Sequence, residues 1–155
     1  MVRILADSTC DLSKELLSQY SIDIIPLQIL LGDREYEDGC GVKPADLFSW
    51  SDENKTSPKT AACRQETAMA ALDKHIAAGD EVICFTISEH MSCTANVIRM
   101  AAQALEAADR VTVVDSANLS TGNGLLVLHA AEMAQQGASR AEIVKAVEKD
   151  RKSVV

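Results

Sequence analysis

Hydroxyl-bearing side chains follow several of the apolar segments that the sequence offers as β-strands. In an open α/β sheet, ligands bind in the crevice beyond the carboxyl ends of the strands. Hydroxyls combined with free amides at helix starts form an anion or carboxylate site that needs no arginine. The side chains in question, including one pair in a loop before a predicted helix, are Ser8, Thr56, Ser57, Ser92, Thr94, Ser116 and Ser120.

Each of these hydroxyls, taken singly, is also typical of a helix cap or a turn. Only their gathering at one sheet edge indicates a binding site. A Ser-His-Asp hydrolase would use a Gly-x-Ser-x-Gly turn, which the sequence lacks. Residues 120–124 lack the Gly-Lys-Ser ending of a phosphate loop. The sequence therefore favours a binding protein that is not itself an enzyme.

Two other functions stay open at this point. One is a small hydrolase or acyltransferase that uses Ser92 or Cys93 as nucleophile with His90 nearby, although neighbours in a loop rarely have the geometry of a base and its nucleophile. The other is an interaction domain whose exposed apolar face docks a partner.

The elements that must position these residues alternate along the chain. Strand-length apolar segments alternate with helical patterns, which predicts an α/β fold with a mainly parallel sheet and helices on both faces. Gly32-Asp33 predicts a hairpin turn, Thr60 and Ser139 are plausible helix caps, and residues 51–60 are loop-like. The predicted strands are 2–6, 22–31, 34–38, 82–87 and 111–114, and the predicted helices are about 13–20, 44–50, 60–78, 94–108, 122–135 and one from Ser139.

Composition limits the class of protein. The chain has 155 residues, 47% of them hydrophobic, which suits a single domain over residues 1–155 with a sizeable core. A formal charge of −8 and only 3% aromatic residues argue against nucleic acid as partner. The longest uncharged apolar stretch, residues 24–31, is too short to span a membrane.

Five widely spaced cysteines give no Cys-x-x-Cys pair and no zinc-like spacing. The composition is typical of free thiols in a reducing cytoplasm, so we expect a cytoplasmic protein. We expect neither a metal nor a cofactor.

Several segments, taken in order along nearly the whole chain, resemble the DegV family of bacterial lipid-binding proteins. Short motifs such as Asp-Ser-Thr or Thr-Ser mean little alone, and it is their order and combination that carry the resemblance. The segments are 6–12, 25–28, 36–39, 56–57, 87–94 and 114–126.

The resemblance implies binding of one long-chain fatty acid. Its carboxylate would be held by hydroxyls and amides of this domain, and its tail would be buried in a tunnel formed with a second domain. Thr56 corresponds to the threonine of the family's Thr-Ser motif and Ser92 to the serine of its Ser-Gly-Thr motif, with Cys93 in place of the glycine. The family also implies that a separate fatty acid kinase receives the bound acid and makes acyl phosphate for phospholipid synthesis.

The chain ends about where the family enters its second domain. We therefore expect an N-terminal domain whose lipid-covering partner domain is absent from this chain. An apolar face near the hydroxyls would then be left open and would favour self-association. Its candidate residues are Ile25, Leu27, Met91 and Leu119.

Overall fold

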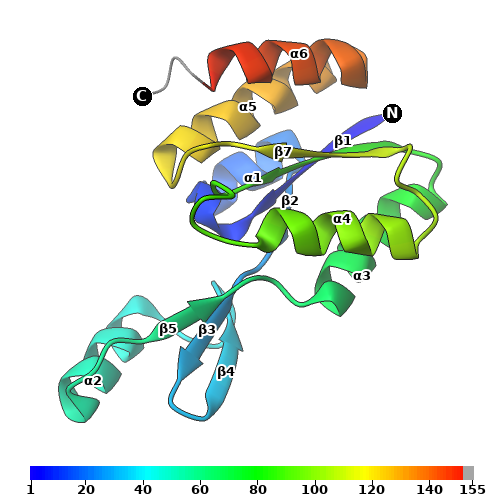
Figure 1. The fold of residues 1–155 in the computed structure, drawn as a ribbon. Helices are drawn as coiled ribbons and strands as arrows, with labels where there is room; N and C mark the ends of the chain where they lie inside the picture. Colours follow the sequence, from blue (N-terminus) through cyan, green and yellow to red (C-terminus); the bar gives the residue numbers. More distant parts are fainter. Residues whose placement is uncertain (152–155) are drawn as a thin grey trace.

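The computed structural model describes residues 1–151 and contains two sheets (Figure 1). The first is parallel, with strand order β2-β1-β6-β7. The second is antiparallel, with order β4-β3-β5. The strands are β1 (Val2–Asp7), β2 (Asp23–Ile25), β3 (Gln28–Leu31), β4 (Arg34–Glu37), β5 (Lys59–Ala61), β6 (Glu81–Thr86) and β7 (Val111–Asp115). The predicted α/β class with a mainly parallel sheet is confirmed.

Helices cover both faces of the parallel sheet, as predicted. On one face lie α1 (Lys14–Tyr20), α5 (Thr121–Gln135) and α6 (Arg140–Asp150), and on the other lie α3 (Gln65–Ala77) and α4 (Thr94–Ala104). Figure 1 shows α5 and α6 above the sheet and α3 and α4 below it. A short 3-10 helix, η1 (Ser8–Cys10), follows β1 directly.

The strands alternate between two cores. Ile4 and Ala6 of β1 pack toward α5 and α6, whereas Leu5 packs toward α3 and α4. All three are at most 4% exposed. A parallel strand covered on both faces reads as a continuous apolar run, which is why residues 2–6 were recognisable as a strand.

The antiparallel sheet and α2 (Pro44–Asn54) form a projection that we call the arm, residues 28–61 (Figure 1). The predicted hairpin at Gly32-Asp33 joins β3 to β4, with Gly32 at φ +61°. The single strand predicted over residues 22–31 is wrong, since the chain leaves the parallel sheet after Ile25 and enters the arm at Gln28. Pro26 lies between them and has no amide N–H to donate to a ladder.

Several element boundaries also differ from the prediction. The helix predicted over 44–50 continues to Asn54, and that predicted over 94–108 ends at Ala104. Thr60 does not cap a helix, because it lies in β5 opposite Ile29, and α3 begins only at Gln65. The predicted cap of α6 is correct, since Ser139 Oγ accepts from Glu142 N at 3.4 Å. The helix predicted from Ser13 begins at Lys14, and Ser13 is its N-cap, with Oγ accepting from Leu16 N at 3.3 Å.

Within residues 1–151, no helix combines the length and the apolar character that crossing a membrane requires. The predicted domain extends to Val155, and residues 152–155 lie outside the described part of the chain.

Candidate functional site

The carboxyl ends of β1, β6 and β7 meet at one edge of the parallel sheet. We call this the carboxyl edge and define it as the segments 7–9, 86–94 and 115–121. Hydrogen bonds tie the three segments together: Ile87 N donates to Asp7 Oδ2 at 2.7 Å and Ser88 N donates to Asn118 O at 3.0 Å. The structure therefore brings the predicted hydroxyl-rich segments after these strands to a common edge.

Ser92 and Thr94 lie at the start of α4. Their hydroxyl oxygens are 2.8 Å apart, and Ser92 Oγ also accepts from Thr94 N at 3.2 Å. Thr94 is buried, whereas Ser92 is half-buried and Cys93 is exposed. Cys93 is the N-cap of α4 and makes no side-chain hydrogen bond to the helix. Because the first turn of a helix carries free amides and a positive dipole end, this start of α4 favours an anion.

The remaining predicted hydroxyls of the carboxyl edge have different roles. Ser8 Oγ accepts from Leu27 N at 3.2 Å, and Ser116 Oγ donates to Asn118 O and accepts from Asn118 N, both at 3.1 Å. These two side chains therefore hold loops in place. Ser120 is the N-cap of α5, has φ 54°, and makes no side-chain cap bond.

Thr56 and Ser57 are not brought to the carboxyl edge. In the β3–β5 ladder, Ala61 lies opposite Gln28 and Lys59 opposite Leu30, so the chain before Lys59 runs further out along the arm. The segment between α2 and β5 that holds both residues lies apart from the first turn of α4 (Figure 1). Their placement in the site was based on a predicted loop before a helix and on the Thr-Ser motif, whereas long-range pairing of β5 determines where that segment lies.

After the arm, the chain re-enters the core of the parallel sheet at Cys63. Burial, together with smaller effects of the nearby charges of Asp7 and Cys93, raises the pKa of Cys63 to about 11. Cys63 is 4% exposed and belongs to the core between the sheet and α3 and α4. The sequence carried no local signal for this placement.

Two further residues, one in the carboxyl edge and one packed against it from α5, were not predicted as site residues. Asp7 is fully buried, and burial raises its pKa against the opposing effect of hydrogen bonds from Thr9 and Ile87. Asn123, on the first turn of α5, is also fully buried, and its Nδ2 lies 3.5 Å from Asp7 Oδ1. Its Oδ1 has no hydrogen-bond partner within residues 1–151. A carboxylate directly after a buried strand was the available signal for Asp7.

The geometry of a catalytic pair is not formed around Ser92. The hydrogen-bond partner of its hydroxyl is Thr94, and in the described part of the chain no base bonds to it. His90 is exposed, and its backbone amide donates to Ser88 Oγ at 3.3 Å. Among residues 1–151, no three His, Cys, Asp or Glu side chains gather as a metal site.

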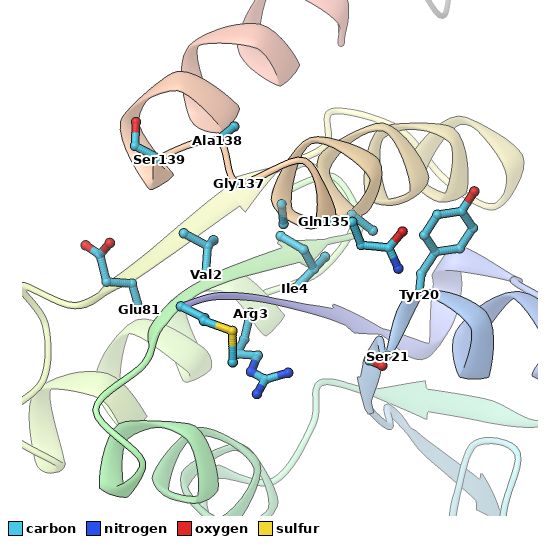
Figure 2. Close-up of a pocket in the computed structure, with 13 residues that line it drawn as sticks. Val2, Arg3, Ile4, Tyr20, Ser21, Glu81, Gln135, Gly137, Ala138 and Ser139 are labelled. Carbon is cyan, nitrogen blue, oxygen red and sulfur yellow. The ribbon is translucent and has the colours of Figure 1, made fainter.

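A pocket of about 560 Å³ lies at the opposite edge of the sheet, where β1 and β6 begin (Figure 2). Its charged lining side chains, and that of Gln135, are already paired within the protein. Arg3 Nε donates to Asp80, Glu81 lies 3.1 Å from Arg140 Nε, and Gln135 Nε2 donates to Gln19 O. This pocket therefore offers fewer free hydrogen-bonding groups to a ligand than the start of α4, where first-turn amides have no partner within the helix.

Apolar side chains flank the hydroxyls of the carboxyl edge. Met91 is 61% exposed and Leu119 is 49% exposed, in agreement with their expected place on an open face. Ile25 and Leu27 were wrongly assigned to that face, because Ile25 is fully buried and Leu27 is 8% exposed. Both pack inward where the chain passes from the parallel sheet to the arm.

The fold and the edge geometry define a class: an α/β domain with a parallel sheet and a hydroxyl-lined helix start at its carboxyl edge. The DegV family model, described as "Uncharacterised protein, DegV family", matches residues 1–154. The chain belongs to the DegV family. It is 33% identical over 146 residues to a DegV domain-containing protein of Clostridium perfringens, covering 94% of this chain and 52% of that protein.

Other relatives give the same picture. A DegV domain-containing protein of Deinococcus radiodurans is 34% identical over 148 residues, covering 96% of this chain and 52% of that protein. A Thermus thermophilus DegV family structure, described by its fatty acid binding, matches with a TM-score of 0.89 and 28% identity, over 97% of this chain and 53% of the other. A stearic acid-binding protein from Eubacterium ventriosum matches with a TM-score of 0.86 and 28% identity, over 96% and 52%. The chain spans about half the length of these relatives.

Proposed function

We propose that this chain binds a long-chain fatty acid and holds its carboxylate at the carboxyl edge. The observation that carries the proposal is the half-buried hydroxyl of Ser92 at the start of α4, beside Cys93 and Thr94. There the helix dipole and the first-turn amides favour a negative charge. Solved relatives of the same fold bind fatty acids, which supports the choice of ligand.

The surroundings suit a ligand that is anionic at one end and apolar along its length. Met91 and Leu119 expose apolar surface in the loops that precede α4 and α5. Each methylene removed from water contributes about 0.8 kcal/mol, so these side chains can shelter part of a tail. We propose that a second domain, corresponding to the other half of the relatives' length, covers the rest.

We further propose that the bound acid is presented to a separate kinase and is not modified by this chain. The pairing of the Ser92 hydroxyl with Thr94 supports binding over nucleophilic attack. Incubation with a chromogenic palmitate ester separates the two possibilities. A hydrolysis rate that falls in Ser92→Ala or Cys93→Ala would favour the hydrolase or acyltransferase.

Equilibrium dialysis with labelled palmitate tests the proposed site. Loss of one hydrogen bond to a charged group costs about 1.5–3 kcal/mol, so Ser92→Ala is expected to weaken binding about tenfold or more. Ser18→Ala is the matched control, because Ser18 is an exposed serine on α1. A neutral fatty alcohol should bind more weakly than the acid. Equal palmitate affinity in both variants and the wild type would overturn the assignment of Ser92.

A further inference from the structure

The buried carboxylate of Asp7 lies beneath the loop that leads into α4. Asp7 is the last residue of β1 and is fully buried. Its Oδ2 accepts from Ile87 N at 2.7 Å, and its Oδ1 accepts from Thr9 N at 3.1 Å and from Thr9 Oγ1 at 2.6 Å. A single carboxylate therefore joins the end of β1 to the first loop residue after β6.

Groups at the end of β7 hold the same loop from the other side. Ser88 N donates to Asn118 O at 3.0 Å, and Glu89 N donates to Asp115 Oδ1 at 3.1 Å. Together with the Ile87 amide on Asp7, three consecutive amides are thus fixed by acceptors from the ends of β1 and β7, which flank β6, and from the loop after β7. The position of the loop is determined by the sheet.

This anchoring extends to Ser92 through a tight turn. Ser88 O accepts from Met91 N at 2.9 Å and from Ser92 N at 3.2 Å. The backbone of Ser92 is therefore placed relative to Ser88, which lies directly after the residue that Asp7 holds. A displacement of Ile87 would be passed on to the start of α4.

Burial of a carboxylate is unfavourable unless its hydrogen bonds are satisfied. Burial raises the pKa of Asp7 despite the donors that surround it. The buried charged carboxylate is therefore less favourable for stability than an apolar side chain would be at this position. The carboxylate does, however, hold the backbone amide of Ile87 against the end of β1. An apolar side chain of similar size could not accept that hydrogen bond.

We propose that Asp7 is a positioning residue of the head-group site, which holds the loop over residues 87–92 so that Ser92 faces the carboxylate of the fatty acid. The inference rests on the proposed function for its ligand, while the anchoring of the loop can be measured independently. Asp7 acts through Ile87 and Ser88 and does not itself contact the ligand.

The test compares Asp7→Asn with Asp80→Asn. The side-chain amide that Asp7→Asn introduces has only one acceptor oxygen, so either Ile87 N or Thr9 loses its partner. Asp80 is the matched control because it is also buried, at 5% exposed, and its bonds to Arg3 and the N-terminus lie at the opposite sheet edge. Amide hydrogen exchange over 87–92 and palmitate binding are measured for both variants.

In Asp7→Asn we expect exchange at Ile87–Ser92 to accelerate about tenfold or more relative to the rest of the sheet, and palmitate affinity to fall about tenfold. Asp80→Asn should leave both unchanged. Thr9→Val, which removes the 2.6 Å bond to Asp7 and the 3.5 Å bond from Asn123 Nδ2, leaves the Asp7 carboxylate in place. It should show the same pattern more weakly and remains informative if Asp7→Asn does not fold.

Loop exchange in Asp7→Asn and Thr9→Val that matches the control would overturn the proposal. Failure of the wild-type protein to bind palmitate would instead contradict the proposed function, and the exchange data would still decide whether Asp7 fixes the loop.

Discussion

Replacement of Gly124 by alanine tests the close approach between α5 and η1 that closes the carboxyl edge. A Cβ atom at Gly124 would lie 2.5 Å from the carbonyl oxygen of Cys10 and 3.2 Å from Leu12 Cδ2. In an exposed helix the same substitution would stabilise by about 1 kcal/mol. Here the obstacle is a backbone atom, which cannot rotate away, and overpacking of this kind costs about 1–3 kcal/mol. We expect overpacking to outweigh the gain in helix propensity, with a net loss of up to about 2 kcal/mol.

Thermal unfolding monitored by circular dichroism measures this loss. A net loss of about 2 kcal/mol would lower the Tm by about 4–8 °C in a domain of this size. Gly122→Ala is the comparison, since its Cβ would meet the side chain of Asn118 at 2.6 Å, and a side chain can move at lower cost. A Gly124→Ala protein as stable as the wild type, or a larger loss in Gly122→Ala, would refute this expectation.

Charge, thiol exposure and the open apolar face each lead to a further prediction. The pKa of Asp80 is lowered to about 2 by Arg3 and the N-terminal ammonium, so the stability lost in Asp80→Asn, measured by urea unfolding, should be largest above pH 4 and shrink as the pH falls toward 2; a loss independent of pH would contradict this. Mild alkylation followed by mass spectrometry should label exposed Cys93 well before fully buried Cys84, and the reverse order would show that the loop or strand is misplaced. Replacement of Met91 and Leu119 by serine should reduce self-association in sedimentation velocity, and unchanged association would place the open apolar face elsewhere.

The parallel sheet was predictable because its signal is local. Residues 2–6 and 82–87 are largely apolar, and both segments pack against cores on two faces in the structure. The predicted cap Ser139 was correct for the same reason, since a cap bonds to an amide three residues away. Patterns that depend on near neighbours can be read from one sequence.

The arm was only partly predictable because its pairing is long-range. The hairpin turn at Gly32-Asp33 is local and was recognised, whereas β5 joins β3 across about thirty residues of sequence. That pairing explains why Thr60 does not cap a helix and why the segment that holds Thr56 lies apart from the carboxyl edge (Figure 1). The break between β2 and β3 at Pro26 did have a local signal in the missing amide of proline.

The candidate site divides in the same way. Ser92 and Thr94 follow a recognisable strand and begin a recognisable helix, so their place at the carboxyl edge could be predicted. The role of Asp7 could not, because it depends on the 2.7 Å contact with Ile87, which lies eighty residues away in sequence. The burial of Asn123 against that carboxylate is equally invisible without the packing of α5 on η1.

The most direct test of the central claim is an amide chemical-shift titration of the wild-type protein with palmitate. We expect the largest chemical-shift changes at the amides of Ser92, Cys93 and Thr94. The amide signals of Val2 and Glu81, which line the pocket of Figure 2, should keep their chemical shifts. Shifts concentrated at Val2 and Glu81, or palmitate binding that leaves the start of α4 unperturbed, would contradict the claim.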